Sequence, residues 1–202
     1  MADRLNGVAR KVPTGAVYLL FLLPAPWFFY LAANGQMGVE PINTLERKYG
    51  EMALQLLILG LAITPLRQYL GINLIRFRRA IGLLAFAYVA MHLLVWLVLD
   101  VGILSQIWAD ILKRPYITVG MGGFALMIPL AITSNNMSIR KLGPKWRKLH
   151  RLTYGVVLLG ALHFLMLSKG FQLEPLIYAA LIGGLLLTRL APPKSMERAR
   201  ST

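Results

Sequence analysis

The chain has 202 residues, of which 57% are hydrophobic and none is cysteine. Its mean hydropathy of +0.60 is too high for a soluble domain of this length, so we expect one all-α integral membrane domain over residues 1–202. The lack of cysteine excludes cysteine-ligated iron–sulfur clusters, covalently attached c-type haem, disulfides and thiol catalysis. The net charge of +14 lies in short clusters between apolar segments, a pattern typical of lipid contact and membrane topology rather than nucleic-acid binding.

The apolar segments predict a bundle of six transmembrane helices, at residues 15–33, 52–66, 80–99, 115–133, 152–168 and 171–190. Pro24 and Pro26 predict a kink in the first. The glycines of the fourth predict close helix packing. Residues 34–51 and 140–151 are polar and are expected to form loops, and residues 100–114 a loop with some helical character. The tail from Ala191 is rich in proline and charge and is expected to be disordered.

The distribution of basic residues predicts the orientation of these helices. If both termini lie on one side, 17 of the Lys and Arg residues lie on that side and 5 on the other. Because basic loops remain on the cytoplasmic side, both termini are expected in the cytoplasm. Most of the acidic residues then lie on the outer side.

The chain has three histidines, and two of them lie deep in apolar segments. His92 lies twelve residues after Ala80, and His163 lies twelve residues after Arg151, where these two segments leave the basic side. Both rings are therefore expected about 18 Å from that boundary, at one depth. Two neutral imidazoles at one depth can supply both axial ligands of a haem iron. This interpretation is favoured over histidines that only hydrogen-bond neighbouring helices.

His150 has two open interpretations. It lies thirteen residues before His163, about 20 Å along a straight helix and about 140° around it. It is either a ligand of a second haem, if the helix start bends, or an interfacial histidine within a basic cluster that binds lipid headgroups.

Other residues near these segments have a cofactor role and a structural role as alternatives. Arg76, Arg78 and Arg79 either determine topology or bind haem propionates or a flavin phosphate, since arginine binds such oxyanions through two nitrogens. Tyr88 and Trp96 lie four residues before and after His92, where they are candidates to pack on a macrocycle edge.

Several sequence blocks resemble one protein family. They are Glu40-Pro41-Ile42, Thr64-Pro65-Leu66-Arg67, and the segments 78–83 leading to His92, 113–120 and 140–151. In this order they are similar to the MsrQ family of haem-binding membrane subunits, within the ferric-reductase-like transmembrane superfamily. The resemblance covers residues 12–190.

The resemblance implies a membrane electron-transfer subunit of an oxidoreductase complex rather than its catalytic subunit. It implies a multi-pass chain in the bacterial inner membrane that binds haem b, with FMN also associated. The electron donor is the quinone pool or a cytosolic flavin reductase. The acceptor is a periplasmic MsrP-type molybdenum enzyme that reduces methionine sulfoxide in oxidised proteins. His92 and His163 match the paired haem histidines of the family, and His150 matches its third.

The chain departs from the wider superfamily in one respect. Two-haem ferric reductases carry two histidines on each of two helices, whereas the position thirteen residues before His92 is here Arg79. No strand with a dinucleotide fingerprint is predicted either, so the electron donor is expected to be external. Two other functions remain open: a stand-alone ferric or quinone reductase, and a haem-free small transporter or assembly protein in which the histidines join helices.

Overall fold

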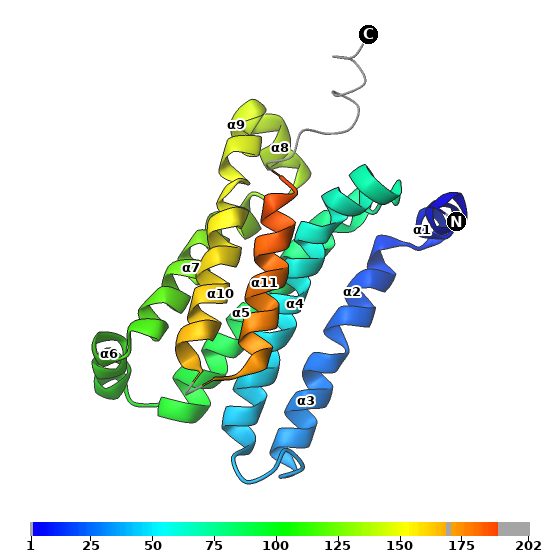
Figure 1. Ribbon diagram of the computed structural model, residues 1–202. Helices are drawn as coiled ribbons and strands as arrows, with labels where there is room; N and C mark the ends of the chain where they lie inside the picture. Colours follow the sequence, from blue (N-terminus) through cyan, green and yellow to red (C-terminus); the bar gives the residue numbers. More distant parts are fainter. Residues whose placement is uncertain (1, 169–170, 190–202) are drawn as a thin grey trace.

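The computed structural model describes residues 2–168 and 171–189, which form a bundle of helices without β-strands. Figure 1 shows helices α8 (Asn136–Leu142) and α9 (Pro144–Leu149) at one end of the bundle, the end at which α1 (Ala2–Lys11) also lies. We call this the basic end, because residues 140–151 lie there. The opposite end, where α4 (Pro41–Leu70) begins, is called the site end.

Five helical segments are long and apolar enough to cross a membrane. They are Thr14–Ala33, Pro41–Leu70, Ile75–Val101, Pro115–Ile132 and Pro144–Leu167. The all-helical membrane fold is thereby confirmed, although the number of spans is not. The sixth expected span corresponds to the shorter apolar helix α11 (Leu173–Leu187), so a sixth crossing stays a prediction. The tail from Ala191 lies outside the described residues.

The first span is broken where the prolines predict a kink. Helix α2 (Thr14–Leu22) ends at Leu22, and α3 (Pro24–Ala33) begins with Pro24. Tyrosines from other helices donate hydrogen bonds to backbone carbonyls on both sides of this break. The Tyr88 hydroxyl donates to the Phe21 carbonyl at 2.7 Å, and the Tyr49 hydroxyl donates to the Ala25 carbonyl at 2.8 Å. These hydrogen bonds connect the first span to the rest of the bundle.

The expected loop over residues 34–51 is wrong from residue 41 onward, because α4 has 30 residues and begins at Pro41. Proline suits the first helical position, where its missing N–H needs no partner. The first turns of α4 expose polar residues on one face and bury apolar residues on another, namely Leu45, Tyr49 and Ala53. This spacing of four residues is helical. The second span therefore begins eleven residues earlier than the expected residue 52.

The basic segment 140–151 is also largely helical rather than a loop. Asn135 caps α8 by accepting a hydrogen bond from the Ser138 backbone N–H at 2.8 Å. Pro144 then starts α9, which leads into α10 (Leu152–Leu167). Helices as short as α8 and α9 contain no long apolar run, so the hydropathy pattern did not predict them. Helix α6 (Leu104–Lys113) occupies most of residues 100–114, in line with the helical character expected there.

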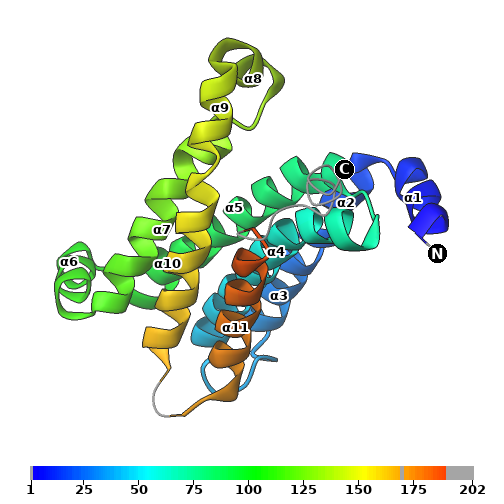
Figure 2. The same ribbon diagram turned by 45° about the horizontal axis from the view of Figure 1, so that its top comes forward.

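Two helix pairs form the centre of the bundle. Helix α4 packs along the third span, which consists of η1 (Ile75–Phe77), α5 (Arg78–Leu94) and the π-helix η2 (Val95–Val101). Helix α7 (Pro115–Ile132) packs along α10, and α11 lies beside α10 and α4 (Figure 2). A Cβ atom at Gly122 or Gly123 of α7 would meet Leu159 of α10 in ordinary contact. These glycines lie at the contact between α7 and α10, but an added Cβ would fit there, so their role in close helix packing stays a prediction.

Arg189 replaces a hydrogen bond that Pro65 removes from α4. Without an N–H at Pro65, the Leu61 carbonyl one turn earlier loses its helical donor, and Arg189 donates to it at 2.6 Å. We expect Arg189→Leu to leave this carbonyl unpaired and to lower the free energy of unfolding by about 1–3 kcal/mol. Thermal unfolding in detergent measures the change. Arg67→Leu, an exposed arginine of the same helix, is the control, and equal melting temperatures for both variants would contradict this role.

Candidate functional site

The rings of His92 and His163 face each other between the two central helix pairs. His92 projects from α5 and His163 from α10, and the ring centroids are 6.1 Å apart with an angle of 81° between the ring planes. The equal count of twelve residues from the basic side predicts this proximity. Because the two rings come from different helix pairs, the site depends on how those pairs pack.

Each ring is held by a backbone carbonyl of the neighbouring helix. His92 Nδ1 lies 2.9 Å from the Glu46 carbonyl, and His163 Nδ1 lies 2.7 Å from the Tyr116 carbonyl. A carbonyl only accepts, so Nδ1 carries the proton in both rings, and Nε2 of a neutral imidazole keeps a free lone pair. The carboxylate oxygen nearest His92 Nε2, Glu46 Oε1, is 3.9 Å away, too far for a hydrogen bond. Both Nε2 atoms are therefore able to bind a metal.

A glycine lies nearest the Nδ1 atom of each ring, one helical turn after the carbonyl that holds that ring. A Cβ atom at Gly50, four residues after Glu46, would lie 3.3 Å from His92 Nδ1. A Cβ atom at Gly120, four residues after Tyr116, would lie only 2.8 Å from His163 Nδ1. The two helix pairs therefore have the same arrangement. One helix supplies a backbone carbonyl and, four residues later, a glycine, and both contact the histidine ring of the partner helix.

Both histidines line one cavity of about 550 Å³, a size typical of small-molecule and cofactor sites. Apolar residues line part of it, including Leu54, Leu57, Val89, Met127 and Val156. Polar residues from the start of α4 and from the α5–α7 connection line its mouth at the site end, including Glu40, Asn43, Arg47, Asp100 and Arg114. No group of three or more His, Cys, Asp or Glu residues that could hold a bare metal ion occurs in the described chain. The site thus suits a metal that brings its own remaining ligands.

Comparison with known proteins identifies the family. Residues 49–161 match the family model of the ferric reductase like transmembrane component. The chain is also 51% identical to the protein-methionine-sulfoxide reductase heme-binding subunit MsrQ of Brucella ovis, Brucella canis and Brucella suis, over 96% of this chain and 91% of each relative. The chain belongs to the MsrQ family. No solved structure matches the chain.

His150, the third histidine that the MsrQ resemblance singled out, lies apart from the other two. It follows α9 at the basic end and does not line the cavity of His92 and His163. Its Nε2 lies 3.1 Å from the Thr133 hydroxyl, which itself donates to the Pro129 carbonyl at 2.6 Å, so the imidazole is the donor. The ring also stacks on Trp146, with centroids 3.8 Å apart. These contacts favour the interfacial interpretation of His150 over the second-haem interpretation.

Other residues that the sequence singled out divide between the MsrQ cavity and the rest of the bundle. Trp96 lines the cavity, whereas Tyr88 is fully buried toward α2 and does not. Arg76 donates to the Ala9 and Arg10 carbonyls and holds α1. Neither Arg76 nor its neighbours Arg78 and Arg79 line the cavity. Their topological interpretation is therefore favoured over propionate binding at this site.

Sequence reasoning missed the two seats of the histidine rings. Gly50 lies in the segment expected to be a loop, and Gly120 was interpreted as a packing residue of α7. The sequence held no signal common to both positions, because Gly120 lies in an apolar segment whereas Gly50 lies in a polar one. The partner of each glycine becomes clear only when the helix pairs are assembled.

Proposed function

We propose that this chain is a single haem b-binding domain that transfers electrons within a protein-methionine-sulfoxide reductase system, with His92 and His163 as the axial ligands. The observation that carries the proposal is the pair of facing imidazoles, 6.1 Å apart, whose Nδ1 atoms are both occupied by backbone carbonyls. The Brucella relatives are named as heme-binding subunits, which supports the same cofactor.

The residues present fit a bis-histidine haem. An imidazole nitrogen binds a first-row metal at about 2 Å, and the ring centre lies roughly 1 Å behind that nitrogen, so two axial imidazoles have centroids about 6 Å apart. The observed centroid separation agrees with this distance. Gly50 and Gly120 leave the rings room beside their helices, and the porphyrin brings the four further nitrogens that the described residues do not supply.

The protein's own contribution is orientation and exclusion of water. When bound, haem supplies reversible one-electron chemistry at its iron. The Glu46 and Tyr116 carbonyls fix the tautomer and direction of each imidazole, and a hydrogen bond from Nδ1–H raises the basicity of the ligating nitrogen. Apolar residues line part of the cavity around both histidines, and ligation requires the neutral form of each imidazole. With His92 and His163 both holding the iron, the haem would suit electron transfer rather than binding of a substrate at the metal.

The direction of transfer follows from the charge distribution. The clusters with most Lys and Arg lie at the basic end, which we place in the cytoplasm of a bacterial inner-membrane protein with both termini inside. The cavity mouth at the site end then faces the periplasm, where an MsrP-type molybdenum reductase accepts electrons. The donor, quinone pool or flavin reductase, and FMN remain predictions from the family resemblance. The role of His150 as a ligand of a second haem also remains a prediction from that resemblance.

Electron transfer to the partner tests this function. The purified chain is reduced and then mixed with the MsrP-type reductase of its own organism and a protein that contains methionine sulfoxide. We expect the haem absorbance to return quickly to the oxidised form when both proteins are present. When a ferric chelate replaces them, we expect a slower return. Reoxidation by ferric chelate that the partner does not accelerate would indicate a stand-alone ferric reductase. Folded, colourless protein without iron would indicate the haem-free alternative.

A further inference from the structure

Helix α6 lies across the direction of the spans at the site end, beside α7 (Figure 1). In both views it lies to the side of α7 away from α2 and α3 (Figures 1 and 2). Its residues divide between two faces. Leu104, Trp108 and Leu112, spaced by four residues, are 80%, 64% and 70% exposed. Ile107 and Ile111 form the adjoining stripe and are half-buried toward the bundle.

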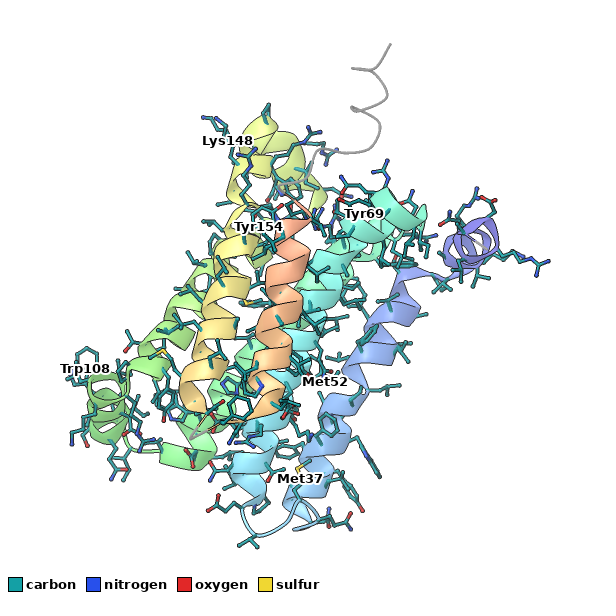
Figure 3. The ribbon with its side chains drawn as sticks, in the orientation of Figure 1. Met37, Met52, Tyr69, Trp108, Lys148 and Tyr154 are labelled. Carbon is teal, nitrogen blue, oxygen red and sulfur yellow. The ribbon has the colours of Figure 1, made fainter. Side chains whose placement is uncertain are left out.

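The polar residues of α6 occupy the opposite arc of the helix. At 100° per residue, the five apolar positions fall within one half-turn, and Ser105, Gln106, Asp110 and Lys113 fall within the other. One part of the apolar arc contacts the bundle, while the part that contains Trp108 does not. Figure 3 shows Trp108 projecting from α6 away from the other helices.

The connections of α6 fix its depth. One residue, Arg114, separates it from α7, which has 18 residues and is therefore about 27 Å long. This length barely matches a hydrocarbon core of about 30 Å, so the first turn of α7 lies at the membrane boundary. At its other end, α6 follows the span Ile75–Val101 after two residues. Both ends of α6 are thus held at the level where lipid headgroups meet acyl chains.

We propose that α6 is an interfacial helix that binds the lipid leaflet at the site end through Leu104, Trp108 and Leu112. An amphipathic helix held at this depth buries its apolar face among acyl chains and leaves its polar face in water. Tryptophan is enriched at this level because its ring is apolar and its N–H is polar. Lipid contact also explains how three large apolar side chains remain exposed beside spans whose outer surfaces are themselves apolar. The inference depends on the membrane fold and not on the haem site.

Spin labelling tests the proposal directly, because the chain has no cysteine and each label therefore occupies one site. Leu104→Cys and Leu112→Cys report the apolar stripe, and Gln106→Cys and Lys113→Cys are matched positions on the polar arc of the same helix. Trp108 stays in place. All four residues are exposed, so the substitutions disturb no buried contact. The labelled full-length chain is placed in vesicles of phosphatidylethanolamine and phosphatidylglycerol, and collisions of each label with oxygen and with a water-soluble nickel chelate are measured.

Oxygen concentrates in acyl chains, and the nickel chelate remains in water. We expect the oxygen-to-nickel collision ratio to be several-fold higher at positions 104 and 112 than at positions 106 and 113. Equal ratios on the two faces would overturn the proposal, because the stripe would then be in water and free to dock a protein. Low collision with both reagents at 104 and 112 would overturn it too, because the stripe would then be covered by another copy of the chain.

Discussion

His163→Ala is expected to abolish the low-spin haem spectrum of the purified protein, and His92→Ala is expected to do the same. Each substitution removes one of two imidazoles that face each other at 6.1 Å, and neither leaves another described His or Cys side chain in the cavity to replace it. The remaining histidine is expected to hold a five-coordinate haem. We expect bound haem per protein to fall by about tenfold or more. Optical spectra with haem quantification measure both effects.

His150→Ala is the matched control for these substitutions. It removes a histidine whose ring contacts Thr133 and Trp146 outside the cavity, so the low-spin spectrum should persist. Added imidazole should also restore low-spin absorption to His163→Ala, because the substitution leaves a space of that shape. An unchanged spectrum in either His92→Ala or His163→Ala would exclude that residue as a ligand.

Gly120→Ala is expected to have the second-largest effect, although it adds only one methyl group. The new Cβ would lie 2.8 Å from His163 Nδ1 and 3.0 Å from Cε1, closer than side chains approach one another. The ring must shift, and the 2.7 Å hydrogen bond to the Tyr116 carbonyl must lengthen or break. Loss of the group that orients a metal ligand costs about 10- to 100-fold in affinity. Haem titration into the haem-free protein measures this loss.

The neighbouring glycines provide graded controls. Gly122→Ala places its Cβ 3.8 Å from Leu159, an ordinary contact, so haem affinity should be unchanged. Gly50→Ala places its Cβ 3.3 Å from His92 Nδ1, so a smaller loss than that of Gly120→Ala is expected. If all three variants bind haem equally, the glycines do not seat the rings and serve only helix packing.

The equal depth of His92 and His163 could be predicted from the sequence. Their two apolar segments begin at the same membrane boundary, and the helical rise converts an equal count of residues from that boundary into an equal depth. Pro24 likewise predicted the break of the first span, because a missing N–H acts within its own helix. Both inferences need only local chemistry and one external length.

The remainder of the site could not be predicted because it depends on contacts between segments distant in sequence. The first turns of α4 are polar on the face that borders the cavity mouth, so Gly50 lay in an expected loop although its helix seats His92. The carbonyls of Glu46 and Tyr116 carry no signal in residue type, since every residue has a carbonyl. The contact of His150 with Thr133, at the end of α7, also required the assembled bundle.

The position of the iron in an experimental map of the haem-loaded protein tests the central claim most directly. The account predicts iron about 2 Å from Nε2 of both His92 and His163, with each Nδ1 still bonded to the carbonyl of Glu46 or Tyr116. Iron bound to only one of these two histidines, or held by His150 alone, would contradict it.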